Sequence, residues 1–130
     1  MPKRFYLATQ KDRSEQAAPL LEALKGQGWE RTYAWSGTDH AGGYADIALA
    51  ELKGVREADV LVVLLPGGYG THVEIGAALA LGKRIILHAP DRKTLNIPYP
   101  CVFHYHPDVR LLVSEPLDVN ALLACMSSYA

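Results

Sequence analysis

A strong charge of one sign is missing from this sequence of 130 residues, because 13 lysines and arginines stand against 14 aspartates and glutamates and leave a net charge of −1 at pH 7. The basic residues are scattered and form no run longer than two residues. Proteins that bind nucleic acid polymers or anionic membranes through charge carry a basic patch or stripe. We therefore expect neither partner for this chain.

Long apolar runs and cysteines are also scarce. No run approaches the roughly 20 residues that a membrane span needs, and the N-terminal stretch MPKRFYLATQ becomes polar too soon for a secretory signal peptide. The two cysteines, Cys101 and Cys125, do not make a disulfide framework or a zinc site. A soluble cytoplasmic protein is the expectation.

What the sequence does contain is enough apolar residues for a core, 49% in all, in a length that fits one domain over residues 1–130. Short apolar or alternating runs predict strands, and apolar residues spaced by three and four predict helices. The predicted strands cover 4–9, 29–35, 59–65 and 84–89, with two short extended pieces at 101–106 and 109–113. The predicted helices cover 14–25, 44–57, a segment from the glycine loop to about 81, and 116–129.

Strands that alternate with helices in this way indicate βαβ units and a parallel sheet. With about five strands, we expect a flavodoxin-like or Rossmann-like doubly wound α/β fold, with strand order 2-1-3-4-5 and helices on both faces. In such sheets the ligand binds at the carboxyl ends of the strands, where the winding reverses. Here that region is formed by residues 8–12 after the first strand and 66–71 after the third.

The loop after the third strand, LPGGYGTHVE, contains Gly67, Gly68 and Gly70. Glycines permit positive φ and the close approach of a ligand to the main chain, and the N-terminus of the helix that follows favours a phosphate or carboxylate. The loop lacks the Gly-Lys-Ser/Thr of a Walker A motif. It also lacks the dinucleotide fingerprint, because Val73 stands where the third glycine belongs.

Glu74 has two possible roles on sequence grounds. Thr71 and Glu74 fit the S/T-x-x-E capping box, in which the glutamate bonds back to the N–H of the first residue. A carboxylate engaged in its own cap would be a poorer nucleophile, so the two roles compete.

The motif Gly70-Thr71-His72-Val73-Glu74-Ile75-Gly76-Ala77-Ala78, followed by Gly82-Lys83 and an apolar strand, resembles the nucleoside 2-deoxyribosyltransferase family, which includes enzymes that hydrolyse nucleoside 5′-monophosphates. Upstream, the family has an acid eight positions before the Asp that opens the third strand, and Glu51 and Asp59 match that spacing. The family acid is usually Asp. The family also has an acid or serine six positions before the glutamate, where this chain has Gly68.

The stretch from Leu65 to Glu74 also resembles the Pro-Gly-Gly-x-Gly-Thr-x-x-Glu motif of the cytokinin-activating phosphoribohydrolases. Both families break an N-glycosidic bond and use the glutamate of this motif. The shared chemistry strengthens the hypothesis that Glu74 is catalytic.

The resemblance implies a set of roles. Glu74 is the nucleophile, Glu51 positions it or the sugar or protonates the leaving base, and Tyr6 orients the Glu74 carboxylate. The resemblance implies that no metal or redox cofactor is needed. It also implies a small-molecule nucleoside or nucleotide as the partner, and a homodimer or higher oligomer. The apolar residues at 111–113 and 122–123 are candidates for the dimer surface. The expected phosphate-binding residues come from the two loops: Thr9, Lys11, Arg13, Gly67, Gly68, Gly70 and Thr71.

Structural interpretations stand beside these roles. Glu51 fits a solvated helix face, and Tyr6 fits the core. Asp39 and His40 are either site or turn residues, and His104 with His106 are either a metal pair or exposed edge residues. The alternative function is a non-catalytic nucleotide- or phosphate-binding module on the same fold.

Overall fold

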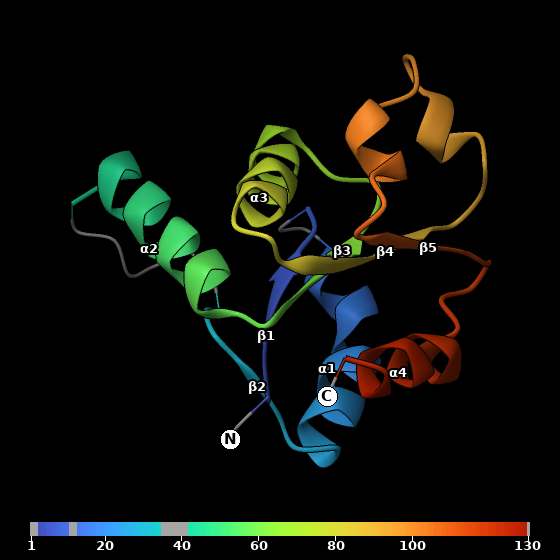
Figure 1. Cartoon of the computed structure of the whole chain (residues 1–130), viewed down its shortest axis with the longest axis horizontal. Coiled ribbons are helices and arrows are strands. Elements are labelled where there is room, and N and C mark those ends of the chain that lie inside the picture. Colours follow the sequence, from blue (N-terminus) through green and yellow to red (C-terminus); the bar gives the residue numbers. More distant parts are fainter. Residues whose placement is uncertain (1–2, 11–12, 35–41, 130) are drawn as a thin grey trace.

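The computed structural model describes residues 3–10, 13–34 and 42–129 of the chain (Figure 1). Its centre is a parallel sheet with the strand order β2-β1-β3-β4-β5, so the doubly wound 2-1-3-4-5 order predicted from the sequence is confirmed. The strands are β1 (Lys3–Ala8), β2 (Trp29–Arg31), β3 (Val60–Leu64), β4 (Arg84–Ala89) and β5 (Val109–Val113).

Helices cover both faces of the sheet, as Figure 1 shows, with α1 and α4 on one face and α2 and α3 on the other. Within the described residues, no helix is both long and apolar enough to cross a membrane. The helices are α1 (Ser14–Gly26), α2 (Tyr44–Glu57), α3 (Tyr69–Ala80) and α4 (Val119–Ser127), with short 3-10 helices η2 (Thr94–Asn96) and η3 (Val102–Tyr105).

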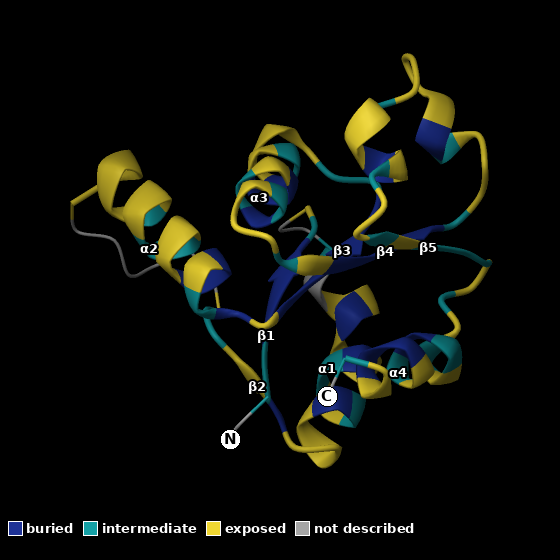
Figure 2. Ribbon diagram, viewed as in Figure 1, coloured by how far each residue is buried: buried dark blue, intermediate teal, exposed yellow. Residues whose placement is uncertain are grey.

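The alternation of side chains along each strand divides the core between the two faces. On β1, Phe5 and Leu7 pack with α1 and α4, whereas Tyr6 and Ala8 pack with α2 and α3. Strand β3 is buried along its whole length, which is typical of a strand covered on both faces (Figure 2). Tyr6 therefore points to the face that carries α2 and α3.

Two segments differ from the sequence prediction. Residues 102–105 form η3 and not an extended piece, so β5 is built only from the second of the two predicted pieces. Strand β2 ends at Arg31, well short of the predicted 29–35. Position 35 itself lies outside the described residues.

The winding reverses between β1 and β3, which are adjacent and in parallel register from Phe5↔Val60 to Ala8↔Val63. The chain leaves β1 toward α1 on one face and leaves β3 toward α3 on the other. The two connections therefore diverge and leave a crevice at the carboxyl ends of these strands.

Candidate active site

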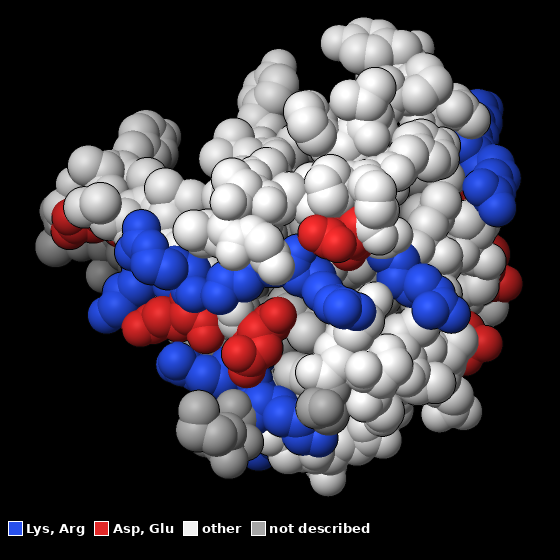
Figure 3. Space-filling view, viewed as in Figure 1, with Lys and Arg blue, Asp and Glu red and all other residues white. Residues whose placement is uncertain are grey.

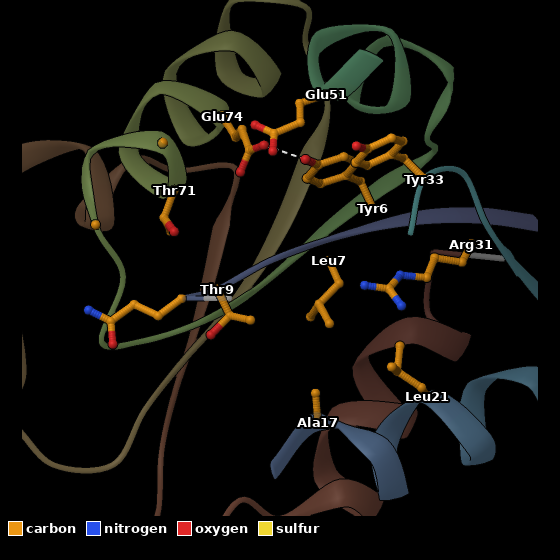
Figure 4. A pocket seen from close by; sticks show the side chains of 13 residues that line it. Tyr6, Leu7, Thr9, Ala17, Leu21, Arg31, Tyr33, Glu51, Thr71 and Glu74 are labelled. Carbon is orange, nitrogen blue, oxygen red and sulfur yellow. Dashed lines mark hydrogen bonds between the residues drawn. The ribbon is translucent and has the colours of Figure 1, made fainter. Parts of the chain in front are cut away.

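A pocket of about 550 Å³ lies at this switch point (Figure 4). Its volume is within the roughly 300–1,000 Å³ range of small-molecule sites. It is lined by side chains or backbone from β1, α1, β2, α2 and α3. The sequence-predicted site residues that line it are Tyr6, Thr9, Glu51, Gly68, Gly70, Thr71 and Glu74.

Glu74 and Tyr6 form the polar centre of the pocket. The Tyr6 hydroxyl donates a hydrogen bond to a carboxylate oxygen of Glu74 (Figure 4). Burial raises the pKa of the Tyr6 hydroxyl above its ordinary value, and the negative charge of Glu74 raises it further. Tyr6 is therefore a protonated donor at neutral pH, and it holds one oxygen of Glu74 in a fixed direction.

The capping box predicted as one role for Glu74 does not form. Helix α3 begins at Tyr69 with Gly68 as its N-cap, so Thr71 is already inside the first turn and Glu74 lies in the second turn. Only 6% of the Glu74 residue surface is exposed, although glutamate is seldom buried. The carboxylate is thus held in a pocket wall and not at a helix terminus.

Glu51, on α2, lies beside this pair. It is half-buried and lines the pocket, and its charge contributes to the raised pKa of Tyr6. In Figure 4 the Glu51 and Glu74 side chains approach the Tyr6 hydroxyl from neighbouring helices. The structure therefore brings the two carboxylates and the tyrosine together in one site.

The glycine loop differs from the expected geometry. None of Gly67, Gly68 and Gly70 has positive φ, which among the described glycines occurs at 28, 43 and 82. A Cβ on Gly67 would lie 2.5 Å from Thr71 Cγ2, so this glycine makes room for the buried Thr71. A Cβ on Gly68 or Gly70 would meet nothing within 4 Å, and both positions face the pocket.

Of the two cations predicted in the first loop, the structure tests only one. Arg13 does not line it, and Lys11 lies outside the described residues. The Thr9 hydroxyl donates to the Leu64 carbonyl at 2.8 Å, so it ties the ends of β1 and β3 together. Asp39 and His40 also lie outside the described residues.

Sequence reasoning missed Arg31 and Tyr33, which reach the pocket from the end of β2. The Tyr33 ring stacks on the Tyr6 ring, with centroids 6.4 Å apart and planes 9° from parallel. Arg31 brings a guanidinium group to the other end of the pocket (Figure 4). Burial lowers the pKa of Arg31. The predicted strand order could have identified both residues, because it places the end of β2 next to the end of β1.

A second group of polar side chains lies outside this pocket. His104 and His106 do not share the face of a strand, because His104 lies in the 3-10 helix η3 and His106 follows it. His104 instead contacts His72 of α3, with 3.1 Å between their Nε2 atoms. Burial lowers the pKa of His104, and the neighbouring His72 lowers it further. His106 Nδ1 accepts a hydrogen bond from the Asp108 N–H.

Comparison with protein families gives one match over most of the chain. A model of the nucleoside 2-deoxyribosyltransferase family matches residues 5–120. No curated protein sequence matches the chain significantly.

Solved structures show the same fold. The Clostridium botulinum CMP N-glycosidase BcmB superposes with a TM-score of 0.66 over 98% of this chain and 100% of its own, at 24% identity. A 2-deoxyribosyltransferase from Bacillus psychrosaccharolyticus gives a TM-score of 0.64 at 18% identity, with 95% of each chain covered. A Leishmania mexicana 2-deoxyribosyltransferase gives 0.56 at 24% identity, with 69% of this chain and 66% of its own covered.

Proposed function

Because the chain belongs to the nucleoside 2-deoxyribosyltransferase family, we propose that it cleaves the N-glycosidic bond of a nucleoside or nucleoside 5′-monophosphate, with Glu74 as the nucleophile. The observation that carries this proposal is the buried Glu74 carboxylate, which receives the Tyr6 hydrogen bond inside a pocket of substrate size.

The chemistry requires a carboxylate next to the sugar. Glycosidic cleavage passes through an oxocarbenium-like transition state, and a carboxylate stabilises it and then bonds to the anomeric carbon. One Glu74 oxygen forms the new C–O bond while the C–N bond breaks and its electron pair leaves with the base. Water then displaces Glu74 and releases the sugar, or the nitrogen of a second base displaces Glu74 and forms a new nucleoside. These two acceptors distinguish a hydrolase from a transferase.

Glu51 is placed to assist either half of this reaction. It lines the pocket on the α2 side, beside the Tyr6–Glu74 pair. When protonated, it can deliver a proton to the departing base, as the acid of a glycosidase carboxylate pair does. When ionised, it can bind a sugar hydroxyl or accept a proton from the incoming water.

The first turn of α3 supports a role in binding a 5′-phosphate. The backbone N–H groups of Tyr69, Gly70 and Thr71 precede the first intrahelical bond, which runs from the His72 N–H to the Gly68 carbonyl. Free amides and the helix dipole favour an anion there, and the side-chain-free Gly68 and Gly70 leave space for it to approach. We therefore propose a nucleoside 5′-monophosphate as the preferred substrate, and the similarity to the C. botulinum CMP N-glycosidase makes CMP the first compound to try.

The test is release of free base, measured by chromatography, from a panel of ribo- and deoxyribonucleosides with and without the 5′-phosphate. A second arm adds a competing base to detect transfer. We expect turnover of at least one monophosphate, faster than that of its nucleoside. Glu74→Gln, which removes the charge and keeps the shape, should lower kcat by about a thousandfold or more. The exposed Glu115→Gln is the matched control and should leave the rate unchanged.

The alternative, a non-catalytic binding module, gives a different result. Calorimetric binding of a nucleotide without release of base would support that module and contradict the proposed activity. If no compound of the panel binds and no base is released, both the proposed activity and the binding module are contradicted. Faster turnover of the free nucleoside would keep the activity but reject the phosphate preference.

A further inference from the structure

Three metal-ligand side chains meet on the opposite side of the first turn of α3 from the pocket-lining residues. His72 comes from α3, and Cys101 and His104 come from the segment that forms η3. One ligand atom of each residue lies within 4.8 Å of those of the other two. None of the three lines the candidate active-site pocket, so this cluster is independent of the proposed glycosidic reaction.

The spacing of the cluster suits a tetrahedral ion. Zn–N bonds of about 2.0–2.1 Å and a Zn–S bond of about 2.3 Å place neighbouring ligand atoms roughly 3.3–3.6 Å apart. The His72 and His104 Nε2 atoms are 3.1 Å apart, which is already close to one edge of that tetrahedron. The Cys101 Sγ atom lies within 4.8 Å of a ring nitrogen of each histidine.

The outer contact of His72 matches that of a metal ligand. His72 Nδ1 lies 2.9 Å from the Gly68 carbonyl, and a metal-binding histidine characteristically donates its second N–H to such an oxygen. That bond places the proton on Nδ1 and leaves the lone pair on Nε2, directed at His104. The Nδ1 atom of His104 is buried and has no hydrogen-bond partner among the described residues. Without an ion, the His104 Nε2–H therefore donates to the His72 Nε2 lone pair, and a bound ion displaces this proton.

We propose that His72, Cys101 and His104 bind one Zn²⁺ ion. A set of two imidazoles and one thiolate binds Zn²⁺ in preference to the harder Mg²⁺ and Ca²⁺ ions, which take oxygen ligands. Three protein ligands leave a fourth position for water. Cys101 and His72 are half-buried, so the ion can enter from solvent.

The ion joins two parts of the fold that are distant in sequence. It links the segment 101–104 to α3 through His72, whose ring also contacts the Gly68 carbonyl at the N-cap of the same helix. Gly68 lines the active-site pocket. Zinc bound by this cluster links the first turn of α3 to η3, and its three protein ligands lie outside the lining of the active-site pocket.

Cobalt and zinc binding test this proposal on the full chain without a histidine tag, after removal of metal by a chelator. One equivalent of Co²⁺ should produce the visible bands of a tetrahedral site and a near-ultraviolet thiolate band, and Zn²⁺ should abolish both by displacing it. Zn²⁺ should also raise Tm, because an ion that binds only the folded state stabilises it. Cys101→Ala should lose the thiolate band, and His72→Ala should weaken Zn²⁺ binding by at least about tenfold.

His106→Ala is the matched control, because His106 lies two residues from His104 and outside the cluster. It should bind Co²⁺ as the wild type does. Circular dichroism establishes that each variant is folded, and the half-buried Cys101 and His72 are used because replacement of the buried His104 leaves a cavity. Absence of tetrahedral Co²⁺ bands in the wild type would overturn the proposal. So would a thiolate band that survives in Cys101→Ala, or equal loss of binding in His106→Ala.

Discussion

Tyr6 links the core to the chemistry, because one face of its ring is packed against Tyr33 and its hydroxyl is bonded to Glu74. Removing the hydroxyl by Tyr6→Phe keeps the packing but releases the Glu74 carboxylate from its fixed direction. A hydrogen bond to a charged group contributes roughly 1.5–3 kcal/mol. We therefore expect kcat for release of base to fall about ten- to a hundredfold, with KM changed less. Tyr44→Phe serves as the control, because Tyr44 is 92% exposed and does not line the pocket.

The raised pKa of the Tyr6 hydroxyl leads us to predict that the stability of the folded protein changes at alkaline pH. The pKa of this hydroxyl is raised on folding, so the folded protein holds this proton more tightly than the unfolded chain. The resulting stability is fully present below the unfolded tyrosine pKa of about 10 and is lost as pH rises through and beyond it. The decrease in Tm between about pH 8 and pH 11 should be smaller in Tyr6→Phe than in the wild type. An equal decrease in both proteins would show that Tyr6 is not the responsible group.

Single residues show where sequence reasoning succeeds and where it stops. The family resemblance singled out Tyr6, Glu51 and Glu74, and the structure brings all three into one pocket. The capping box was wrong because α3 begins two residues before Thr71, and helix starts are poorly marked when glycines precede them. Arg31 was missed because it enters the pocket only through the pairing of β1 with β2, a contact between residues distant in sequence.

Helix α2 positions the site through one small residue. Gly54 packs directly on Tyr6, and a Cβ there would lie 2.9 Å from the Tyr6 ring atoms and 2.9 Å from Tyr33 Cβ. The Gly54 carbonyl also accepts a 2.7 Å hydrogen bond from the Thr32 hydroxyl. Glu51 lies one turn earlier on the same helix, so a shift of α2 away from Tyr6 would also move this carboxylate.

Gly54→Ala tests this placement. Helix propensity alone favours alanine by about 1 kcal/mol, but the ring atoms that it would contact are fixed by the Tyr33 stack and the Glu74 bond. We expect the steric term to exceed the propensity gain, so that both Tm and kcat fall. Gly76→Ala on α3 is the control, because its Cβ would meet nothing within 4 Å, and it should raise Tm slightly. A stabilised, fully active Gly54→Ala protein would contradict the proposed packing role.

The predicted elements differ in how well local sequence determined them. The 44–57 helix was predicted with the bounds that α2 has, and Gly82, with φ of 72°, ends α3 as expected. Residues 101–106 alternate like a strand, yet η3 forms because the edge position beside β4 is taken by β5. Competition between two candidate strands for one sheet edge is decided by tertiary pairing, which local periodicity does not contain.

The face of the molecule in Figure 3 agrees with the near-neutral composition. Figure 3 shows positive and negative side chains interspersed across one face, with few charges over α3 and η3. The apolar residues that suggested a dimer surface from the sequence are not free: Leu122 is fully buried, and Leu111, Leu112, Val113 and Leu123 pack against the two cores. Five of the exposed large apolar residues lie instead in the segment around η3: Ile97, Tyr99, Val102, Phe103 and Tyr105.

We predict that the protein forms a homodimer through this segment, residues 97–105. Val102 and Tyr99 are each 73% exposed in the single chain, and contiguous exposed apolar surface is characteristic of an interface. Light scattering at micromolar concentration should give about twice the 14.2 kDa chain mass. Val102→Glu together with Phe103→Glu introduces charges that an apolar contact cannot accommodate, so the double variant should be monomeric. Leu49→Glu on α2, also an exposed apolar position, should remain dimeric. A monomeric wild type would contradict the prediction, and a dimer that survives the double variant would place the interface on another surface.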